Sequence, residues 1–230
     1  MPSRAARVGG DEARAALEAA YTGLAAVVSA LGPADRRRPT LCAGWRVEAL
    51  LFHCLLDPQR ALVALATPTT EPVDVDFVTY WRDYQPGDSG ARAHARFVRR
   101  VAGAFEDWAM LAGCWAETAQ AMLQAVAAAP VHRRVATQGH VLTLPDLAAT
   151  LAVEATIHHL DLAVAVPDAG APAAAALQMV RRTLDGLLGT APPLPWDDVA
   201  YALKGTGRMA LTRSERARLG ERARAFPLLA

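Results

Sequence analysis

Apolar side chains recur at intervals of three and four residues along much of the chain, which is the spacing of helices that bury one face. The first such run ends at Gly32-Pro33, and a second begins near Trp45. Outside the central stretch described below, the pattern predicts helical regions over residues 11–31, 45–66, 91–129 and 173–188. The protein is therefore expected to be mainly helical.

Several features interrupt this helical pattern. Pro58 is expected to kink or break the second region, because proline lacks an N–H group and clashes with the preceding turn. Gly113 is expected to interrupt the third region. Residues 67–90 combine Pro, Asp, Thr and Gly with an aromatic cluster, a composition typical of a long loop that packs over the protein. Residues 131–142 carry β-branched side chains around Gly139 and predict a short hairpin or an extended link.

The stretch from Thr150 to Ala165 differs from the other helical regions because it places ionisable groups on its apolar face. Glu154, His158 and Asp161 project within about 60° of one another on a helix of 3.6 residues per turn. The sequence Thr143-Leu-Pro-Asp146 predicts where this helix begins, with threonine as its cap and proline in its first turn. Because burying an unpaired carboxylate or imidazole is costly, these groups should have partners.

The composition argues against several classes of function. The 24 Lys and Arg residues nearly balance the 23 Asp and Glu residues, and a net charge of +1 gives no positive field of the kind that nucleic-acid binding needs. Residues 147–166 are long enough to span a membrane, but the charged groups in their middle argue against it. Three cysteines in no zinc or disulfide spacing, and a start without the apolar core of a secretory signal, indicate a reduced cytoplasmic protein.

Glu154 and His158, four residues apart, are well placed to share a metal ion with a ligand from another helix. His53 could supply that ligand, giving a two-histidine, one-carboxylate site inside a helical bundle with positions open for water or substrate. Asp57 and Asp161 each follow a histidine by about one turn, so they are candidates to accept from the imidazole N–H groups that face away from the metal. Taken singly, His53 is more often a satisfied core histidine than a ligand.

Two motifs resemble one known family. Leu41-Cys-Ala-Gly-Trp45 followed by His53, and Glu154-Ala-Thr-Ile-His158-His159-Leu-Asp161, occur in the order found in the mycothiol-dependent maleylpyruvate isomerase family, within the DinB-like group of metal-binding helical bundles. The resemblance covers residues 15–165. It implies an all-α core, a DinB-like antiparallel four-helix bundle, here with a long loop and a small C-terminal extension.

The resemblance also implies a chemistry. It carries zinc ligation onto His53, Glu154 and His158, a ligand set that also suits Fe²⁺ or Ni²⁺. A thiol loses its proton on coordination to zinc and becomes the thiolate that attacks electrophilic carbon. Mycothiol as that thiol rests on the resemblance. Arg82, in the aromatic loop, is the first basic residue to consider as its binding partner, although a surface arginine beside Asp83 is the simpler interpretation.

Three functions remain open. The first is a zinc-dependent thiol S-transferase or isomerase that joins mycothiol to a small electrophilic substrate. The second keeps the metal but changes the reaction, to iron(II) and oxygen chemistry or metal-assisted hydrolysis. The third is a non-catalytic helical binding or stress protein, whose polar residues form a structural network.

The remaining predictions concern the ends and surfaces of the fold. Residues 11–190 are expected to form the bundle and 191–230 an extension with short helices, one of them after a Thr212-x-x-Glu215 capping box. His159 projects about 100° from His158 and is expected to pack. His94 and His132 have no organised neighbours in the sequence. A homodimer is expected only because DinB-like bundles often pair.

Overall fold

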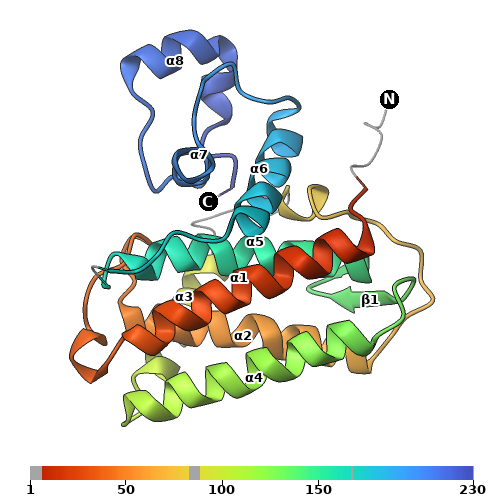
Figure 1. The fold of residues 1–230 in the computed structure, drawn as a ribbon, viewed down its shortest axis with the longest axis vertical. Helices are drawn as coiled ribbons and strands as arrows, with labels where there is room; N and C mark the ends of the chain where they lie inside the picture. Colours follow the sequence, from red (N-terminus) through yellow and green to blue (C-terminus); the bar gives the residue numbers. More distant parts are fainter. Residues whose placement is uncertain (1–6, 83–88, 167, 230) are drawn as a thin grey trace.

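The computed structural model describes residues 7–82, 89–166 and 168–229, and this part of the chain is mostly helical with one small hairpin (Figure 1). Four long helices lie side by side as its main body: α1 (Gly10–Ala30), α2 (Val47–Ala66), α4 (Trp108–Ala128) and α5 (Leu144–Ala163). The most extensive contacts join α1 to α5 and α2 to α4. The predicted all-α fold is confirmed.

The helix α5 is buried on nearly all sides, because α1, α2 and α6 (Ala174–Leu188) all pack against it. Its start lies where the sequence predicts it. The Thr143 side chain accepts a hydrogen bond from the backbone N–H of Asp146 and so caps the first turn. Side chains on α5 are therefore held in a packed interior, where few rotamers are open to them.

The predicted hairpin is present and leads directly into α5. Its strands are β1 (Arg134–Thr137) and β2 (His140–Thr143), which pair antiparallel. Gln138 and Gly139 form the turn with φ values of 50° and 85°. Positive φ at both central residues is typical of two-residue turns whose twist matches that of the strands. The hairpin thus fixes the point from which α5 begins.

The third helical region is interrupted at a different place from the one predicted. α3 (Ser89–Ala102) ends before residue 103 and α4 begins at Trp108, whereas Gly113 lies inside α4. The Asp107 side chain caps α4 by accepting from the backbone N–H of Ala109 at 2.9 Å. A glycine inside a helix costs only about 1 kcal/mol relative to alanine. The prediction at Gly113 was wrong because a good cap and a buried Trp108 five residues earlier decide the boundary.

Pro58 does not end α2, which runs through it to Ala66. Among the described residues, α2 is the one helix whose length and apolar composition would allow it to cross a membrane. Its Leu50 and Leu51 are completely buried against the rest of the protein. A core helix of a bundle explains the same apolar composition.

The predicted loop over residues 67–90 contains a short 3₁₀ helix, and α3 already begins at Ser89. Residues 83–88 of that loop lie outside the described residues. The short 3₁₀ helices found in the described residues are η1 (Pro33–Asp35), η2 (Thr79–Trp81) and η3 (Gly220–Ala225).

The C-terminal region extends from the bundle through α6, which contacts α1 and α5 as well as α7 (Asp198–Gly205). Figure 1 shows α7 and α8 (Arg213–Leu219) set apart from the long helices. The predicted capping box is present at the start of α8, with Thr212 and Glu215 each bonding the other's backbone N–H. A boundary between two units near residue 190 stays a prediction.

Candidate metal centre

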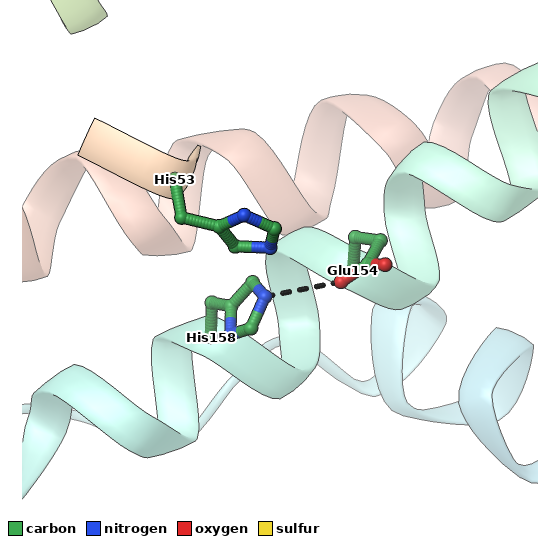
Figure 2. Close-up of side chains that lie close together, drawn as sticks. All are labelled: His53, Glu154 and His158. Atoms are coloured by element: carbon green, nitrogen blue, oxygen red, sulfur yellow. Dashed lines mark ion pairs between the residues drawn. The ribbon is translucent and has the colours of Figure 1, made fainter. Parts of the chain in front are cut away.

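Three side chains from two helices converge at the centre of the bundle. His53 comes from α2, and Glu154 and His158 come from successive turns of α5 (Figure 2). One potential ligand atom from each lies within 4.8 Å of the others. Tetrahedral coordination at about 2.0–2.2 Å would place the ligand atoms about 3.3–3.6 Å apart, so small side-chain shifts suffice to enclose an ion.

The strongest sign that this cluster suits a metal is a buried nitrogen of His158. Its Nε2 lies 3.0 Å from a Glu154 carboxylate oxygen, shown by the dashed line in Figure 2. This contact is an ion pair when His158 is protonated, but its geometry is not that of a hydrogen bond, and within the described part of the chain the buried Nε2 has no well-aligned hydrogen-bond partner. A buried polar atom left in this way is costly. A cation between His158, Glu154 and His53 would satisfy it.

The other nitrogen of His158 is held by a chain of polar contacts. Its Nδ1 lies 3.0 Å from the Oδ2 atom of Asp161, which is fully buried. Arg208, from the C-terminal extension, donates to both carboxylate oxygens of Asp161 at 3.0 and 2.9 Å. Such a bidentate pair is directional as well as strong. The extension therefore reaches into the bundle and fixes the ring of His158 through Asp161.

His53 is held differently, by contacts with other rings and not with carboxylates. Its Nδ1 lies 3.2 Å from Nε2 of His94, which comes from α3. Trp45 and His158 each meet the His53 ring edge to face, with ring centroids 5.4 and 5.0 Å apart. Figure 2 shows one ring nitrogen of His53 turned toward His158 and Glu154. Since Nδ1 faces His94, this inward nitrogen is Nε2.

Asp57 does not have the predicted position beside His53. Its Oδ1 instead pairs with Arg60 Nη1 at 3.2 Å, and no hydrogen bond or ion pair to His53 is found within the described residues. The reason is that Arg60 follows Asp57 by three residues on the same helix, so the two side chains are neighbours. The place expected for Asp57 is taken by His94.

A cavity opens beside Glu154. Its enclosed space is small, about 30 Å³, and opens to solvent, and its polar lining includes Asp57, Arg60, Tyr80 and Gln138. Tyr80 and Gln138 are joined by a hydrogen bond from the Gln138 amide to the Tyr80 hydroxyl. Arg82 is exposed and is not among the described side chains that line this cavity.

The charges of the cluster are unevenly distributed between the two helices. Burial opposes a charged His158, but the carboxylates of Asp161 and Glu154 outweigh it and raise the pKa of His158 to about 10. Burial also opposes a charged Glu154, yet the neighbouring His158 lowers the pKa of Glu154 to about 2. Burial and the nearby His158 lower the pKa of His53 to about 3. In the metal-free protein, α5 thus carries an ion pair and α2 a neutral ring.

Comparison with known proteins now decides the family. Residues 17–163 match the model of the mycothiol maleylpyruvate isomerase N-terminal domain. The chain belongs to this family. The match ends at the last residue of α5, so it contains all three side chains of the cluster but not Arg208. The resemblance expected from the two sequence motifs is confirmed.

A solved structure supports the fold of this maleylpyruvate isomerase family member. It is a crystal structure of a histidine-to-alanine variant of the mycothiol-dependent maleylpyruvate isomerase. The TM-score is 0.54 at 16% sequence identity, covering 79% of this chain and 70% of the other. At that identity the likeness shows a common fold. No curated protein matches the chain.

Two residues that support the cluster in this family member, His94 directly and Arg208 through Asp161, were not predicted from the sequence. His94 is the polar residue on the inner face of α3, and the reasoning that singled out α5 would have found it once α3 was separated from α4. Arg208 is 47 residues from Asp161 and sits in a part of the chain with no local pattern that indicates chemistry. His159, expected to pack, is buried and contacts the backbone oxygen of Gly170 at 2.9 Å.

Proposed function

We propose that this protein is a metal-dependent enzyme, with zinc as the expected ion, that uses mycothiol in a thiol S-transferase or isomerase reaction on a small electrophilic substrate. One observation carries the proposal: three potential ligand atoms meet within 4.8 Å beside a cavity, and one of them is a buried nitrogen without a hydrogen bond. Family membership supplies the thiol and the reaction class as hypotheses.

His53, Glu154 and His158 would hold the ion. When bound, zinc supplies a Lewis acid that lowers the pKa of a coordinated thiol, so that a thiolate forms near neutral pH. Three protein ligands leave a coordination position for this thiol, as in catalytic zinc sites.

The protein's own groups would position and shield the reactants. Asp161 orients His158 so that its Nε2 faces the cluster, and Arg208 holds Asp161 in turn. The apolar side chains Ala61, Leu147 and Leu151 line the cavity beside Glu154 and would exclude water from a bound electrophile.

Basic side chains are candidates to bind the anionic group of the thiol or of the electrophile. Arg82 remains the prediction from the sequence, and it lies at the end of η2, close in sequence to Tyr80 and Trp81 of the cavity wall. Arg60 is a second candidate, because it lines the cavity itself.

Metal content tests the proposal first. Protein purified without a histidine tag should contain close to one divalent ion per chain, and removal of the ion should lower the melting temperature. Replacement of His53 or of Glu154 by glutamine should abolish both effects, whereas the same change at the exposed His132 should leave both intact. A metal-free protein whose melting temperature ignores added zinc would show that the cluster is a structural network instead.

The identity of the metal separates the second candidate function from the first. Two histidines and one carboxylate also form the ligand set of non-heme iron enzymes. Anaerobic purification followed by metal analysis would favour that function if iron were retained in place of zinc and the metal responded to oxygen. The thiol reaction requires no such response.

A further inference from the structure

We propose that His94 is a positioning residue for the metal centre, because its Nε2 accepts a hydrogen bond from Nδ1 of His53 and so leaves Nε2 of His53 free to bind the ion. This inference rests on the proposed metal site. It adds to that site a residue from a third helix, α3, which lies outside the motifs that resemble the family.

The contact between the two rings is specific. His53 Nδ1 and His94 Nε2 are 3.2 Å apart, and the ring planes meet at 71° with centroids 5.4 Å apart. Trp45 and His158 contact the same His53 ring from other directions. His53 is thus confined by three aromatic neighbours, and the contact with His94 is the hydrogen bond that the described residues provide for its Nδ1.

The hydrogen bond determines which nitrogen of His53 carries the proton. A neutral imidazole has one N–H group, and a metal binds the nitrogen that has none. With the proton on Nδ1 and donated to His94, Nε2 of His53 presents a lone pair to Glu154 and His158. The opposite assignment would place a proton on Nε2 and block the ion. An acceptor beside Nδ1 therefore selects the tautomer that can bind metal, and His94 must then carry its own proton on Nδ1.

In most metal sites a carboxylate, a backbone carbonyl or a water accepts from the outer nitrogen of a ligating histidine. The carboxylate expected here, that of Asp57, is paired with Arg60. A neutral imidazole instead serves as the acceptor, so this side of the centre gains no negative charge.

The position of His94 on α3 supports a role directed inward. α3 packs against α2, and the residues that share its inner face are small or apolar: Ala91, Ala95, Val98 and Ala102. The exposed positions of the helix carry arginines at 92, 96, 99 and 100. A histidine that served only as a surface residue would be expected on the exposed face of α3, with the arginines. His94 is instead partly buried, and its Nε2 lies 3.2 Å from Nδ1 of His53, the proposed metal ligand.

Two substitutions distinguish a role of His94 in positioning His53 from a role in packing alone. His94→Leu introduces an apolar side chain of similar size and removes the acceptor, whereas His94→Gln retains an amide oxygen close to the place of Nε2. Competition against a chelating indicator should show zinc affinity reduced about 10- to 100-fold in the leucine variant, the usual effect of losing an outer partner of a ligand. The glutamine variant should recover most of that loss. His132→Gln serves as the control for the loss of an exposed histidine.

The melting temperature in excess chelator provides the readout for packing. We expect it to differ little between the wild-type protein and the two His94 variants, because the effect should require the metal. A leucine variant with wild-type zinc affinity would overturn the role of His94, as would a glutamine variant as weak as the leucine variant. A wild-type protein that binds no zinc would overturn the proposed function itself, so the two failures are distinguishable.

Nitrogen NMR of the unaltered protein tests the tautomer without any substitution. In zinc-loaded protein labelled with ¹⁵N-histidine, the ring of His94 should carry its proton on Nδ1 and leave Nε2 bare. A proton found on Nε2 of His94 would contradict the proposal.

Discussion

The two helices that form the candidate metal centre hold their proposed ligands in contrasting ways. On α5, His158 is completely enclosed in a charged network that runs through Asp161 to Arg208. On α2, His53 is partly exposed and is confined by neutral rings of Trp45 and His94. The first arrangement holds a charged ring through ionic contacts, and the second holds a neutral ring through contacts with other rings.

This difference indicates that the two sides contribute to different properties. A buried charge network is costly to break, because removal of one member leaves the others unpaired. A neutral hydrogen bond between imidazoles contributes little to stability, yet it can still select a tautomer. We therefore expect loss of Asp161 on α5 to destabilise the fold even without metal, and loss of His53 on α2 to act mainly through the metal.

Asp161→Ala should have the largest effect. It would leave Arg208 and the protonated His158 without their shared carboxylate, and loss of one partner from a buried pair costs about 3–5 kcal/mol. Denaturant unfolding in excess chelator should show this loss in the free energy of unfolding, with no metal involved. Asp168→Ala, which removes an exposed aspartate from the loop after α5, is the matched control and should change the stability little. A small effect of Asp161→Ala would mean that the contacts among His158, Asp161 and Arg208 do not stabilise the fold cooperatively.

The pH dependence of stability should have opposite signs for the two histidines. The pKa of His158 is about 10 in the folded protein and near 6.5 when unfolded. Its stabilisation is complete below pH 6.5 and is lost as the pH rises toward 10. His53, with a folded pKa of about 3, favours folding above pH 6.5 and loses that contribution as the pH falls toward 3. Each slope is limited to about 1.4 kcal/mol per pH unit.

Urea titrations of the metal-free protein at a series of pH values measure both slopes. His53→Gln should reduce the change in unfolding free energy between pH 6.5 and about 3, and it should leave the change between pH 6.5 and about 10 as it is in the wild-type protein. If the same substitution reduced the change in unfolding free energy above pH 6.5 instead, the charged group would be His53, and the assignment of charge to α5 would be wrong.

His53→Gln itself should have a modest effect on stability in excess chelator, about 1 kcal/mol, the typical cost of a single substitution. In saturating zinc the same variant should lack the rise in melting temperature that the wild-type protein shows, because a ligand is missing. Calorimetric scans with and without zinc provide both values. An equal loss in chelator and in zinc would indicate that His53 is a structural residue.

Substitutions in the cavity should have the smallest effect on stability. Arg60→Ala removes a partly exposed ion pair with Asp57, and such pairs contribute about 0–1 kcal/mol. Zinc affinity should be unchanged, while KM for the thiol or the electrophile should rise. Arg82→Ala is the comparison that decides between the two arginines. An increase in KM confined to Arg82→Ala would show that the residue predicted from the sequence binds the reactant.

The sequence predicted the parts of the site that depend on local spacing. Helical periodicity and the Thr143 cap placed Glu154, His158 and Asp161 on one face of α5, and the contact between His158 and Asp161 follows from their separation of three residues. The link from α5 to His53 depended on a family resemblance, because no local pattern relates residues about a hundred positions apart in the chain.

Tertiary contacts explain the rest. Arg208 follows α7, which packs on α6, and it reaches Asp161 only because α6 itself packs on α1 and α5. His94 reaches His53 only because α3 packs on α2. Asp57 does follow His53 by about one turn of α2, as its spacing in the sequence predicted. The Arg60 side chain on the next turn competed for the same carboxylate.

The most direct test of the central claim is a titration of cobalt-substituted protein, prepared without a histidine tag, with mycothiol and with other small thiols. The cluster of His53, Glu154 and His158 should bind one cobalt ion per chain, and the visible spectrum should change as a thiolate occupies the open coordination position. A protein that binds no cobalt, or a cobalt spectrum that no thiol alters, would contradict the account.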